Sequence, residues 1–272
     1  MEQSAKVALC FIISGNHVLN KETLWREWIE PNKDIINTYF HYKDYSKISS
    51  NWIKNNAMPP REIQPSSYYH VVNAYMAILH HAKRADETNK WFCLLTESCV
   101  PIISPHLFRK KFLQNKNKSI VNWKKPYWNI HFHHRANLKL LPNKYHLSHD
   151  PWFILTKKHV EFCLHFLTTN TTMYKKINAG GLANESIFAI ILEAYNELTN
   201  SEFVENSVTT LTDWSRKTSP TSPWTFHTCE PIDVEIIEKM LKNNPNACFL
   251  RKVGCNFPDS ILKSYSSDAV NK

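Results

Sequence analysis

The sequence predicts an α/β fold in which helices flank a mixed, mostly parallel sheet. Residues 7–14 (VALCFIIS) and 91–95 (WFCLL) form nearly continuous apolar runs, which are typical of strands buried on both faces. The first elements are a strand over 7–14, a helix over 22–29 and a strand over 35–41, an order that favours a right-handed crossover onto a parallel sheet. No repeat and no low-complexity linker divides the 272 residues, so we expect one domain.

The remaining elements follow from hydrophobic periodicity and from the residues that end each run. Apolar side chains at helical spacing predict helices over residues 66–85, 105–112, 157–167, 184–198 and 234–243. Short apolar runs predict further strands over residues 152–156, 208–214 and 248–253. Gly180 and Gly181 break the chain before the 184–198 helix, and the polar tail from Ser264 is expected to fray.

Glycine is scarce, and this scarcity excludes two classes of nucleotide-binding site. The glycines are Gly15, Gly180, Gly181 and Gly254, whereas a Rossmann fingerprint or a P-loop needs several closely spaced glycines beside the phosphates. A bound diphosphate would therefore be held by side chains, a metal or isolated backbone amides. GxSxG and HExxH motifs do not occur either, which disfavours the common hydrolases and zinc proteases.

The net charge indicates an anionic ligand without identifying it. Lysine and arginine number 33 against 24 aspartates and glutamates, and the lysines are spread along the chain. Nucleic acid, a membrane surface and a nucleotide sugar are all compatible with such a charge.

Cysteine usage and hydropathy bear on the compartment. Seven cysteines without a CxxC pair argue against a zinc ribbon and a disulfide framework, so a reducing compartment is expected. The first apolar run is short and follows a polar start, unlike a secretory signal, and no run reaches transmembrane length. We expect a soluble, cytoplasmic protein of microbial or viral context, or one of the Golgi lumen if an upstream anchor was removed.

Polar and aromatic residues follow the predicted strands, at the edge where ligands bind in open α/β sheets. These residues are Ser14, Gly15, His41, Tyr42, Glu97, Ser98, Trp214, Arg216 and Lys252. The set suits a nucleotide-sugar cleft, although strand ends are polar in most sheets.

Five motifs occur in order along the chain. They are WFCLLTESCVP (residues 91–101), DPWFILTKKH (150–159), NESIFAII (184–191), TDWSR (212–216) and FLRKV (249–253). Together they resemble motifs of the core-2/I-branching β-1,6-N-acetylglucosaminyltransferase family, its plant-like members in particular. The resemblance extends from about residue 6 to residue 260.

This resemblance implies a GT-A-like fold, a UDP-sugar donor, inversion at the anomeric carbon and no obligatory metal or other cofactor. The default sugar is N-acetylglucosamine, and the acceptor is a glycan or glycoconjugate hydroxyl. It implies a single catalytic domain over 1–272, with a donor-binding part over about 6–120. An acceptor and catalytic part over about 121–262 and a polar tail over 263–272 complete the expected organisation.

The resemblance also assigns roles to particular residues. Glu185 matches the family's catalytic acidic residue and would take the proton from the acceptor hydroxyl; a carboxylate that merely complements a helix dipole is the alternative. Lys252 matches a lysine that holds the diphosphate, and Arg251 stands beside it. Because neighbours on a strand point to opposite faces, only one of these two is expected to face the cleft directly, and Lys252 is preferred. His41 ends the strand that contacts the uracil in the family, and we expect it to pack or to bond to the backbone.

Candidate sugar- and acceptor-binding residues come from the second and fourth motifs. They are Asp150, Trp152, Trp214 and Arg216. Both tryptophans would stack on sugar rings, with burial in the core as the alternative. Asp150 and the proline after it replace the family's Gly-Ser, and the region before the terminal lysine offers His227 but no second arginine.

These departures leave two alternative functions open. An inactive glycosyltransferase-like scaffold would bind UDP without turnover. A basic nucleic-acid-binding protein would show a steep salt dependence of oligonucleotide binding, although no known binding motif occurs and no nucleic acid is expected. A metal site at His131 and His133 is disfavoured, because no cysteine or carboxylate follows at ligand spacing.

Overall fold

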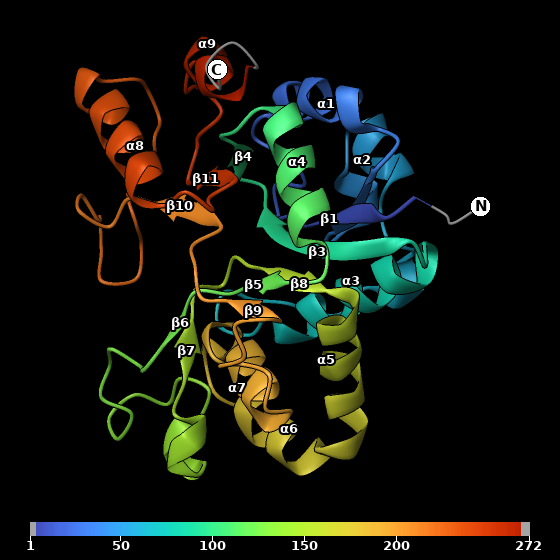
Figure 1. Ribbon diagram of the computed structural model, residues 1–272, viewed down its shortest axis with the longest axis vertical. Helices are drawn as coiled ribbons and strands as arrows, with labels where there is room; N and C mark the ends of the chain where they lie inside the picture. Colours follow the sequence, from blue (N-terminus) through green and yellow to red (C-terminus); the bar gives the residue numbers. More distant parts are fainter. Residues whose placement is uncertain (1–3, 268–272) are drawn as a thin grey trace.

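The computed structural model describes residues 4–267 and confirms the predicted α/β fold (Figure 1). A six-stranded sheet with the order β2-β1-β3-β8-β5-β9 crosses the molecule. Its strands are β1 (Lys6–Ile12), β2 (Ile36–His41), β3 (Asn89–Thr96), β5 (Ser119–Ile120), β8 (Ile154–Thr156) and β9 (Val204–Glu205). β1 runs parallel to β2 and β3, and β5 runs parallel to β9, whereas β8 is antiparallel to both of its neighbours.

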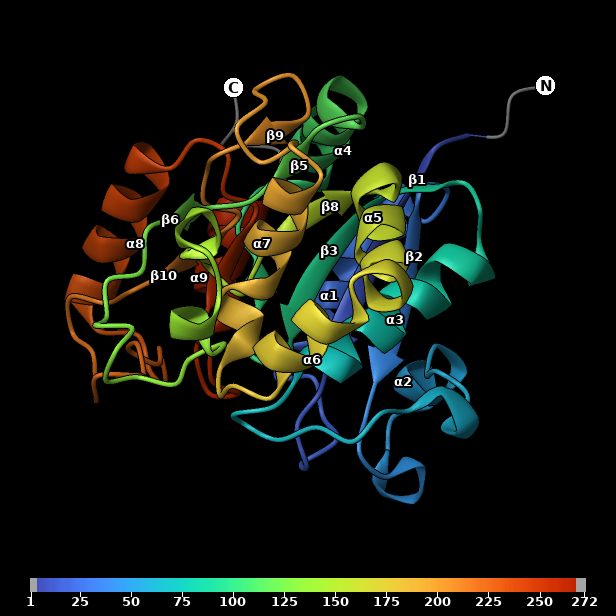
Figure 2. The ribbon, with the colours of Figure 1, turned by 90° about the horizontal axis from the view of Figure 1, so that it is seen from below.

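Helices cover both faces of this sheet. The helices of the described residues are α1 (Glu22–Ile29), α2 (Asn51–Asn55), α3 (Val72–Ala85), α4 (Pro105–Asn115), α5 (Lys157–Thr169), α6 (Thr171–Asn178), α7 (Ile187–Ala194), α8 (Pro231–Asn243) and α9 (Asp259–Ser266). α3, α5, α6 and α7 lie on one face, as Figure 2 shows, and α1 and α4 pack on the other.

The first strand shows why its sequence is apolar at every position. Successive side chains of a strand point to opposite faces, so Val7, Leu9 and Phe11 join the core under α1 and α4. Ala8 and Cys10 join the core under α3 and α5. All five side chains are fully buried, and each contributes about 25 cal/mol per Å² of apolar surface removed from water.

Two small sheets stand at the edge where β1 and β3 end, at the left in Figure 1. The first has the order β10-β11-β4, from β10 (Thr210–Thr212), β11 (Phe249–Arg251) and β4 (Val100–Pro101). The second is an antiparallel ribbon of β6 (Trp123–Lys124) and β7 (Ser148–His149). The N–H of Val253 donates to the carbonyl of Ser98 at 2.9 Å, and the side chain of Asn20 donates to Val253 at 2.7 Å. These bonds hold the chain that follows β11 against the segments that follow β1 and β3.

Most predicted elements are confirmed, and two helices differ from the expectation. The helix expected from residue 66 begins at Val72, because Ser67 and His70 exchange backbone hydrogen bonds in a turn. The helix expected over 184–198 is a 3₁₀ turn, η6 (Ala183–Glu185), followed by α7. Ser186 separates them, because its φ of −143° interrupts the helical backbone.

The carboxyl-terminal tail was expected to be polar over residues 263–272 and frayed from Ser264 onward. α9 instead continues to Ser266, and Lys263 forms an ion pair with Glu27 at 2.6 Å. Residues 268–272 lie outside the described residues. Over residues 4–267, no helix is long and apolar enough to cross a membrane.

Candidate active site

A cavity of about 370 Å³ opens where β1 and β3 end, and we call it the sheet-edge cavity. Its walls come from elements distant in sequence: the ends of β1, β3, β10 and β11, the β7–β8 connection and η6. Eight of the eleven site residues predicted from the sequence line it: Ser14, Glu97, Asp150, Trp152, Glu185, Trp214, Arg251 and Lys252.

A second cavity of about 280 Å³ adjoins the first beside the β6–β7 ribbon, and we call it the ribbon cavity. Lys124, Tyr127 and Arg135 line it from β6 and the loop that follows. Asp150 and Glu185 line both cavities. Two carboxylates thus form part of the wall between two spaces, where a group on one side can react with a group on the other.

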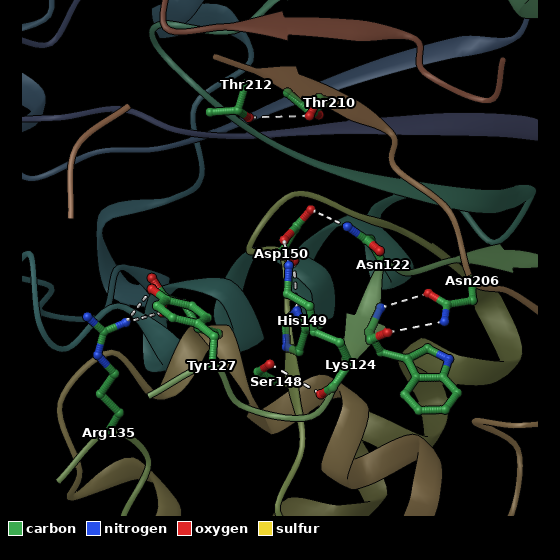
Figure 3. Close-up of polar contacts among 12 residues, drawn as sticks. Asn122, Lys124, Tyr127, Arg135, Ser148, His149, Asp150, Asn206, Thr210 and Thr212 are labelled. Carbon is green, nitrogen blue, oxygen red and sulfur yellow. Dashed lines mark hydrogen bonds and ion pairs between the residues drawn. The ribbon is translucent and has the colours of Figure 1, made fainter. Parts of the chain in front are cut away.

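Asp150 is held in place by the ribbon (Figure 3). Its Oδ2 accepts a hydrogen bond from Asn122 Nδ2 at 2.6 Å, and its Oδ1 lies 3.5 Å from Lys124 Nζ. The backbone carbonyl of Asp150 accepts from His149 Nδ1 at 2.7 Å, and His149 Nε2 accepts from the N–H of Phe188 at 3.3 Å. Burial lowers the pKa of His149 to about 4, so this imidazole is neutral and joins the end of β7 to the start of α7.

Glu185 ends η6, after Leu182 has turned the chain with a left-handed φ of 51°. Burial raises the pKa of Glu185, and Arg135 opposes that rise. Arg135 Nη1 donates to Glu185 Oε2 at 2.9 Å and to Tyr127 Oη at 3.2 Å. The guanidinium also lies 4.9 Å from the ring centroid of Trp128. The carboxylate therefore has a fixed cationic partner in a largely dry environment, where such a contact is strong.

Two cations line the opposite part of the sheet-edge cavity. The Arg251 guanidinium lies 3.8 Å from the ring centroid of Trp152, and its Nε is buried without a hydrogen-bond partner among residues 4–267. Burial lowers the pKa of Arg251. Burial and the charge of Arg251 lower the pKa of Lys252, and Glu97 opposes this. Positive charges that are partly removed from water in this way favour an anionic ligand that would pair with them.

The expectation that only one of these cations faces the cleft is wrong. Arg251 and Lys252 both line the sheet-edge cavity. β11 ends at Arg251, so the alternation of a regular strand does not extend to Lys252.

Two predicted donor-site residues lie outside the sheet-edge cavity. His41 is buried, its Nε2 lies 3.1 Å from the backbone oxygen of Gln64, and burial lowers its pKa to about 4. Ser98 Oγ lies 3.4 Å from Thr96 Oγ1, and the Ser98 carbonyl accepts the Val253 N–H. Both residues therefore hold neighbouring segments together and do not face the cavity.

Arg216, predicted to bind sugar or acceptor, also points away from both cavities. Its Nε donates to Asp213 Oδ2 at 2.7 Å, and its Nη1 lies 2.8 Å from Asp233 Oδ1. Its guanidinium lies 4.7 Å from the ring centroid of Trp224. Arg216 thus ties the turn that carries Trp214 to the start of α8.

Some cavity residues were not recognised from the sequence. Tyr75 lines the sheet-edge cavity, and burial raises its pKa. It belongs to the apolar stripe of α3, so periodicity identifies it only as a core residue. Asn122 and Lys124 reach Asp150 because Lys124 pairs with Ser148 in the ribbon, and this pairing has no sequence signal.

The segment that contains His131 and His133, the disfavoured metal site, does not form a strand. The N–H groups of Phe132 and His133 both donate to the carbonyl of Asn129, which closes a turn. Within the part of the chain that the structure describes, no group of three or more His, Cys, Asp or Glu residues is placed to hold a metal ion.

Comparison with known proteins identifies the family. A family model described as Core-2/I-Branching enzyme matches residues 9–241. The chain belongs to this family, in agreement with the four motifs that lie within these residues, and it is a glycosyltransferase. The fifth motif, at residues 249–253, lies beyond the matched residues.

Comparison with solved structures gives a distant likeness, and 29 chains match. One is 4-diphosphocytidyl-2C-methyl-D-erythritol synthase from Anaerococcus prevotii, with 14% identity and a TM-score of 0.34 over 72% of this chain and 99% of that one. No curated protein matches.

Proposed function

We propose that the protein transfers a sugar, by default N-acetylglucosamine, from a UDP-sugar to a glycan hydroxyl, with inversion and without a metal. The observation that carries this proposal is the position of Glu185 between two cavities, one of which also contains Arg251 and Lys252. The donor occupies the sheet-edge cavity, and the acceptor occupies the ribbon cavity.

The diphosphate of the donor is bound by Arg251 and Lys252. Both cations lie in a partly dry cavity, where charge-assisted hydrogen bonds to phosphate are strong. They supply positive charge that other enzymes of this kind obtain from a metal, and no glycine-rich loop is available for the purpose. The ring of Trp152 fixes the orientation of the Arg251 guanidinium.

In the reaction, the acceptor hydroxyl attacks the anomeric carbon while its proton moves to the Glu185 carboxylate. The bond from the anomeric carbon to the diphosphate oxygen breaks, and the electron pair leaves with UDP. Lys252 and Arg251 stabilise the negative charge that develops on the leaving group. Attack from the side opposite the leaving group inverts the anomeric centre.

Arg135 keeps the base ionised. A general base must be deprotonated, so the rate of transfer falls as the pH falls through the Glu185 pKa. Burial raises that pKa and Arg135 counteracts the rise. Loss of Arg135 therefore moves the acid limb of the pH–rate profile to higher pH.

The test of the base is Glu185→Gln, which keeps the shape and removes the proton acceptor. UDP affinity should be retained, whereas transfer should fall by about 10²–10⁴-fold. The exposed Glu161→Gln on α5 is the matched control. Transfer within a few-fold of the natural protein would exclude Glu185 as the base. UDP binding by the natural protein without any transfer would indicate an inactive scaffold.

The test of the diphosphate site is Lys252→Ala, with Lys242→Ala on the exposed side of α8 as control. The first variant should weaken UDP binding, and the second should not. UDP should raise the melting temperature of the natural protein equally with EDTA and with Mn²⁺. A stabilisation by UDP that EDTA abolishes would contradict the metal-independent proposal.

We also propose that the protein works in a reducing compartment. All seven cysteines are free, five of them are buried, and Cys255 is exposed. Oxidising conditions would leave Cys255 open to intermolecular disulfides. Disulfide-linked dimers of the protein, seen on non-reducing gels of freshly lysed cells that produce it naturally, would contradict this assignment.

A further inference from the structure

The net positive charge of this chain comes from one segment that has no acidic residues. Residues 98–149 contain ten lysines and arginines and no aspartate or glutamate. The remainder of the chain contains 23 basic and 24 acidic residues. The whole excess of positive charge is therefore in this acid-free segment, although lysines also occur elsewhere.

The fold brings part of the acid-free segment to the ribbon cavity. The segment runs through α4, β5 and β6, then through the loop that projects at the left in Figure 1, and ends in β7. It supplies Lys124, Tyr127, Trp128 and Arg135 to the wall of that cavity. Lys217, from the loop after β10, adds a further cation to the same wall.

These cations differ in how far they are already neutralised. Arg135 is committed to Glu185 through its Nη1. Lys124 lies 3.5 Å from an oxygen of Asp150, and half of its side chain, 51%, is exposed. Lys217 is exposed and has no carboxylate oxygen within 4.0 Å among the described residues. Lys124 and Lys217 therefore have charge available for a ligand.

The two carboxylates that line the ribbon cavity, Asp150 and Glu185, do not lie in the same part of its wall as Lys124 and Lys217. Asp150 and Glu185 belong to the wall shared with the sheet-edge cavity, whereas Lys124 and Lys217 line the ribbon cavity alone. A ligand whose hydroxyl reaches Glu185 would present its remaining groups to the two lysines. An anionic substituent there is attracted to them, and a neutral one is not.

Aromatic side chains in the same cavity indicate that the anion is a sugar. Tyr127 is 68% exposed and Trp214 is 50% exposed, and both line the ribbon cavity. Exposed rings of this kind offer flat apolar faces to pyranose rings while their polar edges reach water. A simple phosphate or sulfate ion would make no use of these faces.

We propose that the acceptor is an acidic glycan, in which a carboxylate or a sulfate or phosphate ester lies close to the hydroxyl that receives the sugar. The anionic group pairs with Lys124 and Lys217, the ring stacks on Tyr127 or Trp214, and the hydroxyl faces Glu185. This inference rests on the proposed transfer reaction and identifies the acceptor class for it.

The experiment measures glycan binding directly, by calorimetry at about 50 mM salt, so that it does not depend on turnover. The probes are N-acetyllactosamine, its 3′-sulfate and its 3′-sialylated form, which separate ester from carboxylate. At least one acidic form should bind about tenfold more tightly than the neutral form, through its charge pairing with the two lysines. In the Lys124→Gln, Lys217→Gln double variant, the acidic and the neutral forms should bind with similar affinity.

A matched control uses two exposed lysines of the same acid-free segment that line neither cavity, Lys139→Gln with Lys144→Gln. This control should retain the preference for acidic glycans. The proposal is overturned if no acidic glycan binds more tightly than the neutral one, or if both double variants lose the preference equally. It is also overturned if a single-stranded oligonucleotide, and no glycan, binds through Lys124 and Lys217.

UDP affinity, measured on the same samples, separates the two proposals. UDP binding without a preference for acidic glycans would overturn the acceptor class and leave the transferase proposal intact. A preference for acidic glycans without UDP binding would support the acceptor site and contradict the proposed donor.

Discussion

Replacing Arg216 by methionine should remove the charge that joins two buried aspartates. Asp213 and Asp233 are only 2% and 1% exposed, and Arg216 lies 2.7 and 2.8 Å from their carboxylate oxygens. Methionine retains much of the apolar stem that packs against Trp224. The substitution therefore tests the charge and changes the packing little.

The expected loss of stability follows from this geometry. Removing one partner of a buried ion pair costs about 3–5 kcal/mol, because the other charge stays buried without compensation. Asp213 also accepts hydrogen bonds from the N–H and Oγ of Ser215 at 2.8 and 2.6 Å, so we expect the lower end, about 3 kcal/mol. For a domain of this size the melting temperature should fall by about 6–12 °C.

The pH dependence of this loss has a definite sign. Burial alone would raise the pKa of Asp213, but the bonds from Ser215 and Arg216 outweigh it and lower the pKa below 3.8. A carboxylate with a depressed pKa in the folded state stabilises fully above its unfolded pKa and loses that contribution as the pH falls through the folded value. The difference between the natural protein and Arg216→Met should therefore shrink below about pH 4.

Urea unfolding of both proteins, monitored by tryptophan fluorescence, measures the difference. Arg26→Met is the control, because Arg26 is 60% exposed and pairs with Glu22 at only 3.9 Å; it should cost less than about 1 kcal/mol. Adding Asp213→Asn and Asp233→Asn to Arg216→Met should recover part of the loss. If Arg216→Met lowers the free energy of unfolding no more than the control does, the stabilising role of the ion pairs of Arg216 with Asp213 and Asp233 is refuted. Lost ligand affinity at unchanged stability would instead support direct contact between Arg216 and ligand.

Three further predictions concern the framework of the site. Gly180→Ala should destabilise by about 1–3 kcal/mol, because its Cβ would lie 2.4 Å from a backbone nitrogen of the β6–β7 loop; Gly15→Ala, with nothing within 4 Å, should not. Thermal melts of both variants check this. Phe188→Ala should cost about 3–5 kcal/mol in urea unfolding, since its buried ring is 4.5 Å from another aromatic centroid. His41 and His149 have folded pKa values of about 4, below 6.5. Their stabilising contribution is full above pH 6.5 and should fall by up to about 3 kcal/mol each toward pH 4. A free energy of unfolding that stays constant from pH 6.5 down to pH 4 would contradict this prediction.

The architecture was largely predictable, because burial on both faces leaves a local pattern. The run at residues 7–14 identified β1, and the crossover rule placed β2 beside it in parallel. The ends of helices were less predictable. The backbone of Ser186 interrupts the predicted 184–198 helix. The amino-acid sequence around Ser186 does not distinguish a 3₁₀ turn from the start of an α-helix.

The composition of the site was predicted better than the direction of its side chains. Motifs and strand ends identified eight residues that share the sheet-edge cavity. They also selected His41, Ser98 and Arg216, whose side chains contact other protein groups and do not line the sheet-edge cavity. Position at a strand end sets which edge a residue reaches, whereas packing with distant segments sets where its side chain points.

The sequence by itself determined four strands of the central sheet (β1, β2, β3 and β8), the family and the absence of acidic residues from residues 98–149, because hydrophobic period, ordered motifs and residue charge are local properties. Only the tertiary structure decided that Glu185 meets Arg135 and that Arg251 and Lys252 both face one cavity. These relations depend on the β6–β7 pairing and on the point at which β11 ends. Both arise from contacts between segments far apart in the chain, which no local pattern specifies.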